Sequence, residues 1–252
     1  MVRWVDDLKS ALLLASAFAL AAAATVPLLL PWLPPEARSL PLPLPVFCTA
    51  LAVQLVVLYG LLGFVGIRLA RTQGLEPVPG LTAIWNPQAA RWGWRRAAVA
   101  FAVGLGCGAL LVAAVGAIQR FLPETLPRTL HPPGVAAALL ASTAGSLGEE
   151  ILFRLFALSL LLRLLPAARP GRTLAIGVSA LTFAAAHGPA MVFLFGGWQE
   201  VPQVSWVWLI ALNGLLGVTF GLVFLRSGVV CAVLAHLGTD VVWHVASPLL
   251  RA

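Results

Sequence analysis

The chain has 252 residues, of which 60% are hydrophobic and 10% are charged, and its mean hydropathy is +0.96. Soluble globular domains carry about 25% charged residues, so this composition indicates a polytopic membrane protein. The formal net charge of +7 would suit nucleic acid in a soluble chain, but no polar, aromatic-rich segment is present to bind it. Arginines between apolar segments are instead typical of topology determinants and of contacts with lipid phosphates.

Three cysteines, Cys48, Cys107 and Cys231, all lie inside apolar runs. Their spacing matches neither a metal-binding motif nor a disulfide framework. We therefore interpret them as small buried hydrophobic residues.

The first predicted span, Ser10–Leu30, has 21 residues and can cross about 30 Å of hydrocarbon. It follows a short polar start, Met1–Lys9. Its alanine-rich end is similar to a signal-peptide cleavage site, but the apolar run exceeds the roughly 7–15 residues of a signal peptide, and Asp6 and Asp7 interrupt the basic start. We expect a retained span, followed by a proline-rich outer loop, Pro31–Pro45.

Two further spans, Val46–Ala70 and Ala97–Phe121, are joined by the longest polar connection, Arg71–Arg96. Tryptophans beside arginines in this connection predict a segment that lies in the headgroup layer. Small residues in the third span should let neighbouring helices approach closely. These residues are Gly104, Gly106, Gly108 and Gly116.

The fourth predicted span, Gly134–Leu165, would be about 48 Å long as one helix. Because that length exceeds the hydrocarbon thickness, we expect it to tilt, to bend near Gly145 or Gly148, or to emerge into water. The preceding loop, Leu122–Pro133, contains His131, which we interpret as a surface residue. Three more spans follow. The fifth runs from Thr173 past His187 to a break at Gly188-Pro189, with a continuation to Phe195. The sixth runs from Val204 to Leu225, and the seventh from Val229 to Leu250.

The sequence thus predicts an all-α bundle of about seven transmembrane spans, with six to eight allowed. Placing the N-terminus in the cytoplasm puts eleven basic loop residues on the inner side and four on the outer side. The positive-inside rule therefore favours an N-in, C-out integral membrane protein, in the plasma membrane if the source is bacterial.

Three charges interrupt the fourth span. Each costs about 2.5–3.5 kcal/mol at the centre of a membrane helix, so each needs a partner or a use. Glu150 and Arg154 are one turn apart, with the acid first, and we predict that they form a structural pair. Glu149 points about 100° away from Glu150 and has no local partner.

Other ionisable side chains are predicted to lie at the depth of Glu149. Glu149 is 16 residues from Leu165, His187 is 15 from Arg172 and Asp240 is 14 from Arg226, which places all three about 21–24 Å from the inner boundary. His236 precedes Asp240 by one turn. Taken singly, each histidine is more often a hydrogen-bond partner between helices, the role we expect for Asn213, and His244 extends the same face by another turn.

Clustered ionisable groups in a membrane indicate function, and this set suits the activation of water. We expect Glu149 to take the proton and His187 to orient the water or to share the proton. His236 would donate a hydrogen bond to a developing oxyanion, and Asp240 would fix its tautomer. The same four side chains offer nitrogen and oxygen ligands for a divalent metal such as zinc, although no His-Glu-x-x-His motif is present.

A non-catalytic alternative stays open. Buried glutamate and histidine side chains also form the proton relays of transporters, and an immunity protein that binds a partner would need no catalysis. No inverted-repeat symmetry is visible between the two halves of the chain.

Three segments match family motifs in order. Glu149-Glu150-Ile151-Leu152-Phe153-Arg154 fits Glu-Glu-x-x-x-Arg, Phe183 to His187 fits Phe-x-x-x-His, and His236 to Asp240 fits His-x-x-x-Asn/Asp. On these motifs the chain resembles the CPBP family of intramembrane endopeptidases, also called the Abi or CAAX-protease family. The family includes the eukaryotic CAAX prenyl protease.

The resemblance implies a peptide or protein substrate that enters from the membrane or the inner face. It implies that Glu149 and His187 activate water and that His236 and Asp240 occupy oxyanion-stabilising positions. Eukaryotic members have asparagine where this chain has Asp240, so that residue must be protonated, support His236 or ligate a metal. The family has been described both as glutamate-dependent proteases and as metalloproteases.

We accordingly divide the chain into two parts. Residues 1–133 hold the first three spans and the interfacial loop 71–96, and residues 134–252 form a CPBP-like catalytic membrane domain. The cleavage prediction requires Glu149, His187 and His236 to line one cavity.

Overall fold

The computed structural model describes residues 4–33, 38–86, 93–121, 134–166 and 168–249. These residues form a helical bundle with no β-strand among them. The predicted all-α membrane architecture is therefore confirmed.

Among the described residues, six helical segments are long and apolar enough to cross a membrane. Their counterparts are α1 (Trp4–Leu29), α2 (Leu44–Thr72), α4 (Trp94–Phe121), α7 with α8 (Arg169–Ala185 and Gly188–Phe195), α9 (Gln203–Ser227), and α10 with α11 (Val229–Asp240 and Ser247–Leu249). A seventh helix contains the predicted fourth span and runs without a break through α5 (Gly134–Glu149), a π-helical segment (Glu150–Leu158) and α6 (Ser159–Leu164). In this helix a wider π turn starts at Glu150, directly after the stretch from Gly145 to Glu149 where a bend was one of three expected outcomes.

The first helix begins earlier in the chain than the predicted first span. α1 begins at Trp4, and Asp7 is fully buried. One oxygen of Asp7 lies 2.9 Å from Arg71 Nε and the other lies 3.3 Å from Arg68 Nη1, both on α2. The two arginines neutralise the carboxylate, which is why the helix can extend one and a half turns further than hydrophobicity alone predicts.

The predicted interfacial connection contains a short helix, α3 (Pro79–Trp85). Trp85 Nε1 donates a hydrogen bond of 3.1 Å to Ser10 Oγ, and Lys9 lies over the Trp85 ring. This part of the connection therefore packs back onto α1. Residues 87–92 of the connection, and the loop with His131, lie outside the described residues.

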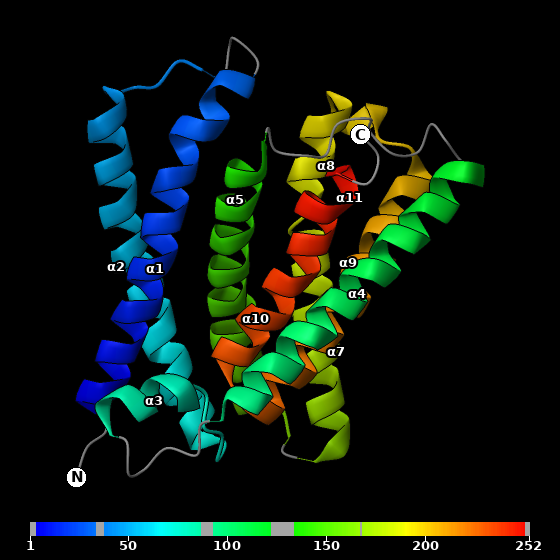
Figure 1. The fold of residues 1–252 in the computed structure, drawn as a ribbon. Coiled ribbons are helices and arrows are strands. Elements are labelled where there is room, and N and C mark those ends of the chain that lie inside the picture. Colours follow the sequence, from blue (N-terminus) through cyan, green and yellow to red (C-terminus); the bar gives the residue numbers. More distant parts are fainter. Residues whose placement is uncertain (1–3, 34–37, 87–92, 122–133, 167, 250–252) are drawn as a thin grey trace.

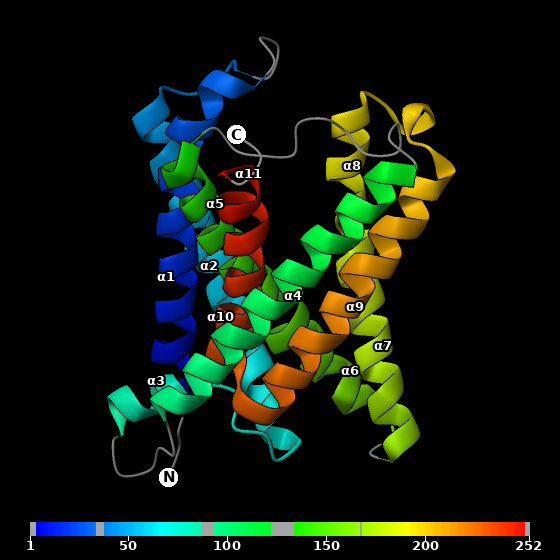
Figure 2. The same ribbon diagram turned by 45° about the vertical axis from the view of Figure 1, so that its right-hand side comes forward.

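The helices pack in pairs (Figures 1 and 2). α1 and α2 lie side by side and pack against α5 and the following π-helical segment, while α7 and α9 form a second pair. α10 lies between these groups, and α4 crosses it diagonally. The first turn of α1 and the short α11 lie at opposite ends of the bundle, as an odd number of crossings requires.

Glycines allow α4 and α10 to touch through their backbones. A Cβ atom on Gly104 would collide with the Ala235 carbonyl group, and one on Gly108 would lie 2.8 Å from the Thr239 oxygen. Thr239 Oγ1 also donates a hydrogen bond of 3.1 Å to the Gly104 oxygen. Two of the four predicted contact glycines thus serve this interface, whereas Gly106 and Gly116 face open space.

We predict that Gly104→Ala lowers the free energy of unfolding by about 1–3 kcal/mol, because its methyl group meets backbone that cannot rotate away. Gly106→Ala is the matched control, since nothing lies within 4 Å of its Cβ position. That control should be neutral or slightly stabilising. Thermal unfolding in detergent measures both, and equal melting temperatures for the two variants would contradict the packing described.

Candidate active site

The two adjacent glutamates lie where the helix widens. Glu149 is the last residue of α5, and Glu150 is the first of the π-helical segment. A π turn leaves backbone groups without their usual α-helical partners and is common at functional sites. Here Ser179 Oγ on α7 donates a hydrogen bond of 2.8 Å to the Phe153 carbonyl oxygen. The widened turn is therefore fastened to the neighbouring helix.

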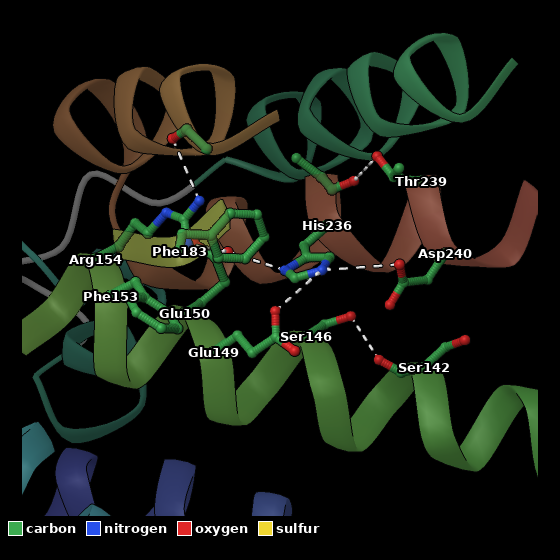
Figure 3. Close-up of polar contacts among 12 residues, drawn as sticks. Ser142, Ser146, Glu149, Glu150, Phe153, Arg154, Phe183, His236, Thr239 and Asp240 are labelled. Atoms are coloured by element: carbon green, nitrogen blue, oxygen red, sulfur yellow. Dashed lines mark hydrogen bonds and ion pairs between the residues drawn. The ribbon is translucent and has the colours of Figure 1, made fainter. Parts of the chain in front are cut away.

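Glu150 and Arg154 form the predicted structural pair. Glu150 Oε1 lies 3.4 Å from Arg154 Nη1, and both side chains are fully buried. Arg154 Nη2 also donates to the Gly217 carbonyl oxygen on α9 at 3.3 Å (Figure 3). The guanidinium carbon lies 4.2 Å from the centre of the Phe183 ring and 5.5 Å from that of Phe220, a cation–π arrangement. The charge of Arg154 is thus held by a carboxylate, a carbonyl group and two aromatic faces.

His236 is held by Glu150, which we did not predict. His236 Nδ1 lies 3.0 Å from Glu150 Oε1, and the ring stacks on Phe220 with centres 4.7 Å apart (Figure 3). We expected Asp240 to fix the tautomer, but Asp240 Oδ1 lies 3.8 Å from the other ring nitrogen, Nε2. Glu150 reaches Nδ1 across the helix interface, while Asp240, one turn along α10, faces Nε2.

Glu149 faces both histidines. Its Oε2 atom lies 3.9 Å from His187 Nε2 and 3.9 Å from His236 Nε2. These separations exceed a direct hydrogen bond. Oε2 has no hydrogen-bond partner among the described residues. The carboxylate that lacked a local partner in the sequence is therefore uncommitted and is directed at the two imidazoles.

His187 is oriented by the break between α7 and α8. α7 ends at Ala185 and α8 begins at Gly188, as the Gly188-Pro189 dipeptide predicted. His187 Nδ1 lies 2.9 Å from the Phe183 carbonyl oxygen, which can only accept, so Nδ1 carries the proton. In the neutral ring the lone pair on Nε2 then faces Glu149.

A third carboxylate, that of Asp240, lies near the Glu149 carboxylate. A Cβ atom on Gly145 would lie 3.8 Å from Glu149 Oε1 and 3.9 Å from Asp240 Oδ2. A glycine at this position, one turn before Glu149, keeps the gap between the two carboxylates open. The comparable depths of Glu149, His187, His236 and Asp240 along three helices thus correspond to a real convergence.

A cavity of 340 Å³ adjoins the convergence. His187, His236 and Asp240 line it, and most of the remaining lining is apolar, including Trp208 and Trp243. Glu149 does not line this cavity, although a third of its side chain is exposed. The prediction that Glu149 shares a cavity wall with both histidines is therefore only partly met.

Asn213 and His244 are among the other polar residues that line the cavity. We expected Asn213 to bond across a helix interface, but its Nδ2 donates to the Leu209 carbonyl oxygen of its own helix at 3.0 Å. An intrahelical acceptor one turn away satisfies the amide without a second helix. His244 lies in a second π-helical segment, Val241–Ala246, which follows Asp240 directly.

The imidazole and carboxylate side chains of the site are of types that bind a divalent metal, but their donor atoms lie too far apart. Neutral imidazole and carboxylate are good zinc ligands, and adjacent ligands of a tetrahedral zinc ion lie about 3.3 Å apart. The nearest donor pairs here are 3.8–3.9 Å apart. Within the described ranges, no group of three or more histidine, cysteine, aspartate or glutamate side chains is arranged to hold a metal ion. We therefore derive no step through a metal.

We predict that Arg154→Met costs about 3 kcal/mol of stability, because it removes the cation from a fully buried Glu150. The double variant Glu150→Gln/Arg154→Met should recover part of that loss, since no uncompensated charge remains. Arg163→Met, at an exposed position of α6, is the control and should be neutral. Chemical unfolding in detergent provides the measurement, and a double variant less stable than Arg154→Met would argue against the buried ion pair.

The comparisons with known proteins concern the segment that carries the three motifs. The family model described as type II CAAX prenyl endopeptidase Rce1-like matches residues 131–242, the segment that carries all three motifs. No curated protein and no solved structure matches the chain. Over residues 131–242 the chain is therefore similar to the Rce1-like family of type II CAAX prenyl endopeptidases, the resemblance that its motifs predicted.

Proposed function

We propose that this protein hydrolyses a peptide bond of a membrane-associated protein, with water activated by Glu149 and His187. The match to the Rce1-like family supports an intramembrane endopeptidase. The observation that carries the mechanism is the position of the uncommitted Glu149 Oε2, 3.9 Å from Nε2 of both His187 and His236. Carboxylate, imidazole and an adjoining cavity together suit attack by water on a carbonyl group.

Glu149 acts as the general base in this proposal. A water molecule between Glu149 Oε2 and His187 Nε2 gives its proton to the carboxylate, and its oxygen attacks the carbonyl carbon of the peptide. His187 orients the water by accepting its second hydrogen at Nε2, which the Nδ1 contact to the Phe183 oxygen leaves unprotonated. When the tetrahedral intermediate collapses, Glu149 returns the proton to the leaving amine, so the carboxylate is regenerated.

His236 stabilises the oxyanion. As an imidazolium it donates through Nδ1 to Glu150 and through Nε2 to the substrate oxygen. The Asp240 carboxylate, 3.8 Å from Nε2, stabilises the positive charge of the ring. An ionised Asp240 cannot itself donate to the oxyanion, so in this chain that work falls to His236.

The adjoining cavity is proposed to hold the substrate beside the cleaved bond. Its lining is mainly apolar, with Trp208, Leu209 and Trp243 among the lining residues. Such a surface suits the apolar side chains of a peptide that arrives from the lipid.

We predict that Glu149→Gln lowers cleavage about 100-fold or more, because the amide cannot accept the proton. The melting temperature should stay near that of the wild type, since Glu149 makes no hydrogen bond that the structure depends on. Glu200→Gln is the control, an exposed carboxylate that lies outside the site. The measurement is mass spectrometry of membrane-protein termini in cells that carry each variant.

New termini that vanish only in Glu149→Gln would identify the substrate and the cut together. Cleavage that persists in this variant would refute the mechanism. If no termini differ and the protein in liposomes instead carries a flux that follows a pH gradient, the non-catalytic alternative is correct.

The mechanism also predicts that a chelator leaves cleavage unchanged and that no divalent metal copurifies in a one-to-one ratio, because no step uses one. Metal analysis of the purified protein and an activity assay after chelation test this. Loss of activity that zinc restores would assign the same side chains to a metal centre.

A further inference from the structure

A basic groove lies at the end of the bundle where α1 starts, away from the candidate active site. It has a volume of 500 Å³ and runs between the first turns of α4 and the last turns of α9. Arg95, Arg96 and Arg226 line it, together with the apolar side chains Val99, Val103 and Val223. We propose that this groove binds an anionic phospholipid, with its phosphate on the arginines and an acyl chain along the valines.

The charges of the groove are not balanced from within the described part of the chain. All three arginines are exposed, and no salt bridge or side-chain hydrogen bond joins any of their guanidinium groups to another described residue. Asp7, a carboxylate at the same end of the bundle, pairs instead with arginines of α2. Three neighbouring cations repel one another, so a bound anion would relieve that repulsion as well as form charge-assisted hydrogen bonds.

The order of side chains along α4 favours a lipid over a free anion. Arg96, Val99 and Val103 follow one another at helical spacing, so charge gives way to an apolar wall along a single face. The two valines are 56% and 38% exposed. Trp94, 82% exposed, lies beside the arginines, as tryptophan does at headgroup level. A ligand that covers both the arginines and the valines needs a negative head and an apolar tail.

This end is also the one that the positive-inside rule predicts to be cytoplasmic, where anionic lipids attract basic segments. Basic pockets between transmembrane helices on that side are known to bind phosphate headgroups. The site is independent of the proposed proteolysis, since no groove residue lines the cavity beside His187 and His236.

Native mass spectrometry of the full-length protein in detergent tests the proposal, with phosphatidylglycerol and phosphatidylcholine as probes. We expect one tightly bound phosphatidylglycerol and no comparable phosphatidylcholine. The triple variant Arg95→Gln/Arg96→Gln/Arg226→Gln should bind phosphatidylglycerol about 100-fold more weakly. Val103→Trp fills the apolar wall without changing the charge and should also weaken binding, so the test survives if the triple variant fails to fold.

The matched control is Arg163→Gln/Arg169→Gln/Arg172→Gln, which removes the same charge from exposed positions of α6 and α7 near the same end. It should bind phosphatidylglycerol like the wild type. Equal weakening in both triple variants would mean diffuse attraction and would overturn the site. Binding of glycerol phosphate as tight as that of phosphatidylglycerol would mean a site for free anions, and failure of the wild type to retain phosphatidylglycerol would also refute the proposal.

Discussion

The cost of burying charge in an apolar bundle shapes this structure. Arg154 and Glu150 are both fully buried, and neither would be tolerated alone. The charge of Arg154 lies against Glu150, the Gly217 carbonyl group and the faces of Phe183 and Phe220. Because Glu150 Oε1 also contacts His236 Nδ1, the same pair positions the imidazole. The ion pair therefore connects its own helix with α7, α9 and α10 and orients one ring of the candidate site.

The geometry of the helices, together with the ion pair, positions the side chains of the candidate site. The π-helical segments start directly after Glu149 and directly after Asp240, so each widened turn follows a carboxylate of the site. Behind α10, the contact of Gly104 with Ala235 brings the α4 backbone against the helix that carries His236. Rigid backbone contacts of this kind hold the donor atoms at fixed separations without covalent links.

The two adjacent glutamates, Glu149 and Glu150, make different contacts in this geometry. Glu150 is committed to Arg154 and His236, whereas Glu149, the next residue back, keeps Oε2 without a hydrogen bond. One glutamate is thus committed to contacts with neighbouring side chains, and the other keeps a carboxylate oxygen without a hydrogen bond among the described residues. The basic groove lies apart from both, at the end of the bundle where the described arginines gather. The molecule combines a buried, internally paired polar centre with an exposed set of unpaired cations.

The sequence by itself determined the membrane architecture, the order of the spans and which side chains to consider for the candidate site. Apolar length sets the spans, and the similar distances of Glu149, His187 and Asp240 from their helix ends predicted that these residues lie at one depth. Only the tertiary structure decided which nitrogen of His236 faces which carboxylate, and that Glu150 is its partner. Spacing along a helix gives depth and face, whereas contacts across an interface depend on how helices rotate and cross, which one sequence does not encode locally. For the same reason, the sequence predicted arginines near the headgroups, but only packing placed Arg96 and Arg226, from distant helices, in one groove.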